Sequence, residues 1–235
     1  LGDSAQPDSG PEWGGLSPLG KDAVRECNRL GLVIDASHSA DSVLHELLTL
    51  SQTPVILTHS ACKAVFAHPR NVTDDLLREL AAHGGVIQMN TVSSFLIPVP
   101  INPEFNAANA KLTAKYAGRE LTSAQRVERY FEGLKLADQF KIPRATFDDF
   151  LKHLFHAIDV AGADHVGIGA DMDGGGGVTG LEDVGDYPKI TLALLKHGMS
   201  ETDIEKIWGG NTLRLLRAAE DYAATAKAAP RSEEH

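Results

Sequence analysis

The chain has 235 residues, of which 43% are hydrophobic, so it is long enough and apolar enough to form one large or two small globular domains. Its formal net charge of −10 argues against a nucleic-acid groove and against electrostatic attachment to an anionic membrane. Two cysteines are too few for a disulfide framework or a thiolate zinc site. Chemistry on a small molecule fits this composition better.

No apolar run approaches the roughly 20 residues that a membrane span needs. A charged segment followed by an apolar one, as in a signal peptide, is not visible at the start of the chain either. We therefore expect a cytoplasmic or periplasmic protein without a span, and the sequence leaves the compartment open. The chain begins with Leu1 rather than with methionine, from which we expect that a segment upstream has been lost.

Residues 16–60 predict a helix followed by a strand-helix-strand unit. Ser17 and Pro18 are typical of a helix start, and Gly31 is typical of a helix end. Apolar runs at 32–36 and 55–57 predict two strands, and apolar residues at helical spacing predict a helix between them. Because the strands of such a unit run parallel, their carboxyl ends meet on one rim of the sheet, where binding groups converge in α/β folds.

The rest of the chain predicts two further strands and several helices. We expect strands at 86–90 and 166–169, with helices that start after Thr73 and Ser200 and others at 123–140, 146–161, 188–196 and from 211 to about 224. Residues 91–121 contain three nearby prolines and then become polar, which predicts an irregular excursion or a lid. Otherwise residues 1–235 are expected to form a single domain.

Four parallel strands with helices between them define an α/β fold. Purely parallel sheets are buried on both faces, and a closed β/α barrel needs eight strands in typically ~250 residues. Either a second segment completes a barrel, or the four strands form an open sheet.

A histidine follows each of the first two predicted strands almost at once, His38 after one and His59 after the other. A single histidine in such a place more commonly hydrogen-bonds a loop. Two of them on neighbouring strand ends favour a shared metal ion such as zinc. A catalytic zinc typically needs three protein ligands, so a further ligand must come from elsewhere.

Three other residues at the same rim are candidates for a site. Asp171 follows the fourth strand and could bind a metal, act as a general base or simply cap a turn. Arg70 lies in the loop after the second strand and could grip a substrate carboxylate through two parallel hydrogen bonds, although a surface position is its default. Asn90 ends the third strand and could donate to a substrate or satisfy a loop.

Cys62, His153 and His156 have a more ordinary interpretation. Cys62 lies three residues after His59, but a buried thiol that fills space is commoner than a nucleophile. His153 and His156 are spaced for metal binding on a helix, yet that helix has an apolar face to pack, so we interpret them as structural or exposed.

The sequence resembles the membrane (renal) dipeptidase family of zinc peptidases. The matching segments, in chain order, are GLSPLG, NRLGLVIDASHS, PVILTHS, HPRNVTDDLL, VAGADHVGIGADMDG, GLEDV and GGNTLRLL. The interval of 21 residues from His38 to His59 matches as well. This resemblance implies a TIM-type β/α barrel with two zinc ions per complete barrel, which hydrolyses the amide bond of dipeptides by a hydroxide that bridges the metals.

The resemblance also implies roles for individual residues. His38 and His59 match the two histidines that hold one zinc ion. Arg70 matches the arginine that binds the terminal carboxylate of the substrate, and Asp171 matches the aspartate that handles protons during hydrolysis. Asn90 stays a candidate substrate-binding residue from its position alone.

Part of the family's metal site cannot be placed on this sequence. The family's first strand carries a His-x-Asp pair for the other zinc ion, and a later strand supplies the glutamate that bridges both metals. We therefore expect this chain to be the carboxyl-terminal half of a barrel, with an amino-terminal half in the same or another chain. Two alternatives stay open: a related barrel metallohydrolase that acts on another amide, an ester or a lactam, and a non-catalytic half-barrel that serves as a binding or scaffold subunit and could pair as a homodimer.

Overall fold

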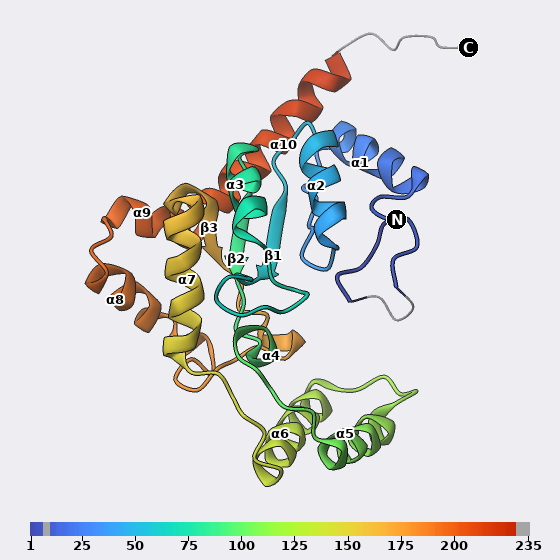
Figure 1. The fold of residues 1–235 in the computed structure, drawn as a ribbon, viewed down its shortest axis with the longest axis vertical. Coiled ribbons are helices and arrows are strands. Elements are labelled where there is room, and N and C mark those ends of the chain that lie inside the picture. The colour runs from blue at the N-terminus through green and yellow to red at the C-terminus, as the bar shows by residue number, and fades with distance from the viewer. Residues whose placement is uncertain (7–9, 229–235) are drawn as a thin grey trace. The chain divides into compact units, whose positions relative to one another are not determined.

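The computed structural model describes residues 1–6 and 10–228, and it shows a helix-rich α/β fold around a small parallel sheet (Figure 1). Strands β1 (Ile56–Ser60), β2 (Val86–Met89) and β3 (Val166–Ile168) are hydrogen-bonded in the order β1-β2-β3. Both pairs are parallel. The α/β class expected from the sequence is thus confirmed.

The segment 32–36, expected as the first of four strands, joins the sheet through a single bridge between Asp35 and Ile56. Two backbone bonds make this bridge, from Ala36 N–H to Ile56 O at 2.9 Å and from Ile56 N–H to Ile34 O at 3.0 Å. The pairing stops there because the Thr58 N–H, which would next donate to Ala36 O in a parallel ladder, donates to the Asp35 carboxylate at 3.1 Å instead. The structure therefore shows three regular strands with a bridged segment beside them, and a half barrel of four strands is not confirmed.

The helices agree closely with the positions expected from capping residues. Ser17 accepts a hydrogen bond from Gly20 N–H at the start of the first helix, and Thr73 accepts one from Leu76 N–H at the start of the third. The α-helices of this part of the chain are α1 (Pro18–Leu30), α2 (Asp41–Leu50), α3 (Asp74–Ala82), α4 (Ser93–Leu96), α7 (Phe147–Ala161), α8 (Pro188–Lys196), α9 (Glu201–Glu205) and α10 (Asn211–Ala228). A π-helical turn, η4 (Lys206–Gly210), connects α9 to α10. Short 3-10 turns are η1 (Ala163–His165), η2 (Met172–Gly174) and η3 (Val184–Asp186).

Helices α2, α3 and α7 lie side by side along the sheet (Figure 1), and α10 contacts β2 and β3. The apolar faces of α2, α3 and α7 form one core with the strands, and Leu215 of α10 forms a second cluster with Ile56 and Val86. Leu57, Ile87, Phe150 and Leu154 are each at most 2% exposed. With the body of the sheet covered in this way, the polar residues of the strands gather where the strands end.

The chain divides into two compact units, Leu1–Ile97 with Ala145–His235, and Pro98–Arg144. The second unit contains α5 (Pro103–Tyr116) and α6 (Ser123–Gln139), joined by an ion pair between Lys115 and Glu132 at 2.6 Å. Residues 91–121 therefore differ from the irregular excursion expected from their prolines. Pro103 occupies the first turn of α5, where its missing N–H has no helical partner to lose.

Every candidate site residue belongs to the first unit. Among the described helices, none is both long enough and apolar enough to cross a membrane.

Candidate active site

His38 and His59 come together at the carboxyl end of the sheet. His59 lies within β1, and His38 follows the segment bridged to β1. Their Nε2 atoms are 2.9 Å apart and their ring centroids 5.0 Å apart. Two imidazoles whose Nε2 atoms converge in this way present the donor atoms that a zinc ion binds.

The ring of His59 is held from its other side by a polar network that the sequence analysis missed. His59 Nδ1 is 2.8 Å from the Thr58 hydroxyl, which in turn donates to Asp35 Oδ2 at 2.6 Å. The Ser37 hydroxyl donates to Asp35 Oδ1 at 2.6 Å and accepts the backbone N–H of His59 at 3.1 Å. The signal in the sequence was an aspartate inside an apolar run, three residues before a histidine.

Arg70 is buried rather than on the surface, with 4% of the residue exposed. Its backbone N–H donates to the His68 ring at 3.2 Å, and its guanidinium carbon lies 5.1 Å from the centre of the Phe95 ring. Within the described residues, neither terminal nitrogen of the guanidinium, Nη1 or Nη2, has a hydrogen-bond partner. A buried cation with two free donors is a strong attractor for a carboxylate.

Asp171 follows β3 and adopts a left-handed backbone conformation, with φ 57° and ψ 42°. Its carbonyl accepts N–H groups from Gly174 at 3.1 Å and Gly176 at 2.8 Å, so a tight turn presents its carboxylate. The Thr91 hydroxyl, just beyond β2, ties this turn down by donating to Ala170 O at 2.5 Å. A non-glycine residue in this region is uncommon, and aspartate adopts it more readily than most.

Glycine at position 169 lets β3 approach β1 at the level of the site. A Cβ atom built there would lie 1.8 Å from the Thr58 carbonyl oxygen, far inside van der Waals contact. The sheet is therefore curved enough to bring its first and third strands together, which places the turn of Asp171 near the paired histidines.

Asn90 follows β2 directly and is fully buried. Its Oδ1 accepts the N–H of Val92 at 2.9 Å, which fixes the orientation of the amide. Its Nδ2 finds no partner among the described residues. A buried donor without a partner is costly, so Asn90 is suited to a ligand that accepts from it.

The charged groups of the site act on one another. Partial burial lowers the pKa of His38, and the charges of Arg70 and His59 lower it further, while Asp35 and Asp171 act in the opposite direction. Burial also lowers the pKa of Arg70, again opposed by Asp171 and Asp35, although a guanidinium stays protonated near neutral pH. The low pKa of His38 favours the neutral imidazole, the form that binds metals.

Cys62 and His153 are structural in this fold. Both are fully buried, and burial raises the pKa of the Cys62 thiol to about 12, so the thiolate is not formed near neutral pH. His153 Nδ1 accepts the N–H of Cys62 at 3.1 Å, and its Nε2 donates to Leu96 O at 3.2 Å. His156 pairs with Asp74 at 2.8 Å, which joins α7 to α3.

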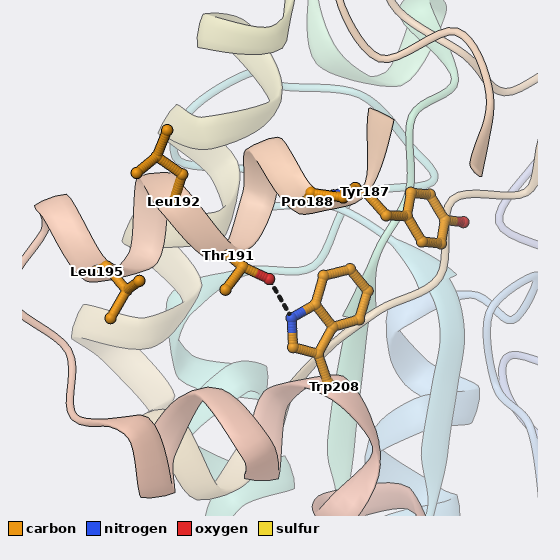
Figure 2. A pocket seen from close by; sticks show the side chains of 6 residues that line it. All are labelled: Tyr187, Pro188, Thr191, Leu192, Leu195 and Trp208. Carbon is orange, nitrogen blue, oxygen red and sulfur yellow. Dashed lines mark hydrogen bonds between the residues drawn. The ribbon is translucent and has the colours of Figure 1, made fainter. Parts of the chain in front are cut away.

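A separate apolar pocket of about 440 Å³ lies beside α8 (Figure 2). Trp208 Nε1 donates to the Thr191 hydroxyl at 2.9 Å across it. The lining residues are Tyr187, Pro188, Thr191, Leu192, Leu195 and Trp208. This pocket shares no residue with the paired histidines and lacks the polar groups that hydrolysis needs, so we do not assign the chemistry to it.

Two converging imidazoles, a buried guanidinium and a carboxylate at the strand ends of a parallel α/β fold are typical of metal-dependent hydrolases. The donor set fits zinc, which accepts imidazole nitrogen readily. Among the described residues, no group of three or more His, Cys, Asp or Glu side chains is placed to hold a metal ion.

Comparison with known proteins agrees with this class. The sequence model of the membrane dipeptidase family, peptidase family M19, matches residues 1–230. An uncharacterized dipeptidase of Schizosaccharomyces pombe is 34% identical over 209 residues, which cover 88% of this chain and 41% of that protein. The dipeptidase tcpJ of Claviceps purpurea is 34% identical over 214 residues, which cover 91% of this chain and 40% of that protein.

Solved structures show the same relationship. The probable dipeptidase PvdM from Pseudomonas aeruginosa has a TM-score of 0.75 and 31% identity, covering 94% of this chain and 60% of that one. A metallo peptidase from Rhodobacter sphaeroides, liganded with a phosphinate mimic of the dipeptide L-Ala-D-Ala, has a TM-score of 0.65 and 29% identity, covering 87% of this chain and 47% of that one.

The chain belongs to the membrane dipeptidase family, peptidase family M19. The resemblance found in its sequence is thereby confirmed. The chain spans about two fifths of the length of the curated relatives that it matches.

Proposed function

We propose that this protein is a zinc-dependent dipeptidase, whose substrate is a dipeptide bound by its free carboxylate. The observation that carries the proposal is the 2.9 Å approach of His38 Nε2 to His59 Nε2 near the buried guanidinium of Arg70. Nη1 and Nη2 of this guanidinium have no hydrogen-bond partner among the residues that the structure describes. Two relatives that carry the name dipeptidase and one solved with a dipeptide mimic support the choice of substrate.

His38 and His59 would hold one zinc ion through their Nε2 atoms. A bound zinc ion would supply Lewis acidity, which lowers the pKa of water and polarises the carbonyl group that is attacked. A catalytic zinc typically needs three protein ligands. We propose that the remaining ligands, and those of a second zinc ion, come from the amino-terminal half of a β/α barrel, in the same or another chain.

Arg70 and Asn90 would bind and orient the substrate. The free Nη1 and Nη2 atoms of Arg70 match the two oxygens of a carboxylate, and such a fork-to-fork pair fixes direction as well as distance. The free Nδ2 of Asn90 would donate to an oxygen of the bound peptide. A substrate gripped by its terminal carboxylate must be short, because the scissile bond has to reach the histidines from that anchor.

Asp171 would move the proton. Its carboxylate would accept a proton from the attacking water and pass it to the leaving nitrogen, as general base and then general acid. The tight turn that holds Asp171, and the Thr91 hydroxyl that anchors the turn, keep the carboxylate at the rim while the proton moves.

Metal analysis of the purified protein tests the proposal. We expect bound zinc in the native protein and its loss in the variants His38→Ala and His59→Ala. His45→Ala is the matched control, because His45 is an exposed histidine of α2 whose ring pairs with Glu79 at 2.8 Å. Equal zinc content in His38→Ala, His59→Ala and His45→Ala would contradict the metal site.

Substrate profiling separates the dipeptidase from a related metallohydrolase. A dipeptidase should cleave dipeptides and fail on dipeptide amides, which lack the free carboxylate that Arg70 would grip. Equal cleavage of both forms would favour an enzyme acting on another amide, an ester or a lactam. Zinc-free native protein without hydrolytic activity would favour a binding or scaffold subunit.

A further inference from the structure

Asp35 lies at the centre of the hydrogen bonds beneath the paired histidines. Its Oδ1 accepts three bonds, from Ser37 N–H at 3.0 Å, Thr58 N–H at 3.1 Å and the Ser37 hydroxyl at 2.6 Å. Its Oδ2 accepts the Thr58 hydroxyl at 2.6 Å. Each of the two hydroxyls therefore donates its single hydrogen in a bond to the carboxylate.

This arrangement decides where the proton of His59 lies. The Thr58 hydroxyl uses its single hydrogen in the bond to Asp35. Its oxygen can therefore act only as an acceptor toward His59 Nδ1, at 2.8 Å. Nδ1 must then carry a hydrogen and donate it. A neutral imidazole has one N–H, so the lone pair is left on Nε2. There it accepts the Nε2–H of His38 at 2.9 Å.

We propose that Asp35 is a positioning residue that acts through Thr58 to hold the proton of His59 on Nδ1 and thereby keeps the lone pair on Nε2, the ligand atom. The inference deepens the proposed function and rests on it only for the metal, because the position of the proton is a property of the metal-free protein. In metal-binding histidines, the N–H of the second ring nitrogen usually donates a hydrogen bond directly to a carboxylate, a carbonyl or water. Here the Thr58 hydroxyl lies between His59 and the carboxylate, and Asp35 determines which way the O–H of Thr58 points.

The ionisation of Asp35 agrees with this role. Partial burial acts to raise the pKa of Asp35, but the hydrogen bonds from Ser37 and Thr58 outweigh it, so the pKa lies below its usual value. The carboxyl is ionised near neutral pH and acts only as an acceptor. The same carboxylate orients Ser37, whose hydroxyl oxygen accepts the backbone N–H of His59 at 3.1 Å.

The isosteric variant Asp35→Asn should reverse the direction of both hydrogen bonds, the one between residue 35 and Thr58 and the one between Thr58 and His59 Nδ1. Its amide oxygen should take the place of Oδ1, because the backbone N–H groups of Ser37 and Thr58 point at this position and can only donate. Its NH₂ group would then face Thr58 and donate to it, which frees the Thr58 proton to point at His59 Nδ1. The proton of His59 would move to Nε2, and the ligand atom would be blocked.

Nitrogen-15 NMR of the histidine rings in the metal-free protein tests this directly, with the His59 signals assigned by their absence in His59→Gln. We expect native His59 to carry its proton on Nδ1 and Asp35→Asn to carry it on Nε2. Thr58→Val removes the relaying oxygen and should lose the preference for Nδ1. Thr58→Ser keeps the oxygen and is the matched control, which should retain the native form.

Zinc titration is the second measurement. Loss of a group that orients a ligand typically weakens metal binding by ~10- to 100-fold, so we expect that loss in Asp35→Asn and Thr58→Val and little change in Thr58→Ser. Native His59 with its proton on Nε2, or variants that keep the native tautomer, would overturn the inference. Variants whose tautomer shifts while zinc affinity stays native would overturn it as well. A tautomer that shifts as expected in a native protein without zinc affinity would refute the proposed metal site and leave the role of Asp35 standing.

Discussion

The buried His153 should make the stability of this protein depend on pH. The side chain has no exposed surface, and burial lowers its pKa from 6.5 to about 4, only partly opposed by the hydrogen bond to Leu96 O. Its neutral ring fits both neighbours, since Nδ1 accepts from Cys62 N–H and Nε2 donates to Leu96 O. A second ring proton would point at the Cys62 N–H and break that bond.

The sign follows from which state takes up the proton first. As the pH falls through about 6.5, the unfolded chain protonates His153 while the native protein does not, so the free energy of unfolding decreases. The loss continues down to about pH 4, where the native ring is protonated as well. A difference of about 2.5 pKa units at ~1.36 kcal/mol per unit amounts to about 3 kcal/mol.

Urea unfolding at several pH values measures this loss, followed by the fluorescence of Trp13 and Trp208, which report on the same compact unit as His153. His153→Gln is the reference, because a glutamine can accept and donate but does not titrate. Between pH 7 and pH 4 the native protein should lose about 3 kcal/mol more than the variant. Parallel pH profiles for the two proteins would refute the claim that burial keeps His153 neutral.

Three further predictions concern the site and the core. In the complete enzyme, Arg70→Ala should raise the KM for dipeptides at least ~10-fold, because hydrogen bonds to charged groups contribute ~1.5–3 kcal/mol each, and an unchanged KM would rule out the carboxylate grip. Asp171→Asn should keep the native zinc content and lower kcat by ~10²- to 10⁴-fold in steady-state assays, whereas unchanged turnover would remove Asp171 from proton transfer. Leu154→Ala should cost ~2–5 kcal/mol in urea unfolding because Leu154 is fully buried in the core, and a cost near zero would show that the site collapses around the smaller side chain.

Local signals were enough to predict most helices. A cap such as Ser17 or Thr73 and a terminating glycine such as Gly31 act within one helical turn, so the sequence carries them directly. The prolines near residue 100 were misleading because the same residue type marks a loop and the first turn of a helix. Only the residues that follow, which form α5, distinguish the two.

The pairing at residues 32–36 could not be predicted from the apolar run. The run is strand-like, but the Asp35 carboxylate accepts the Thr58 N–H that would have continued the ladder. Thr58 is 23 residues away from Asp35 along the chain, so no local pattern contains the interaction.

The sequence by itself determined which chemical groups stand at the ends of the strands, because alternation of apolar runs and helices places His38, His59, Asn90 and Asp171 there whatever the details of packing. Only the tertiary structure decided what those groups can do. Two properties arise from contacts between distant segments. One is the burial of the Arg70 guanidinium, whose Nη1 and Nη2 have no hydrogen-bond partner in the described part of the chain, and the other is the proton order from Asp35 through Thr58 to His59. Desolvation and hydrogen-bond direction depend on every neighbour in space, and sequence periodicity records only the neighbours along the chain.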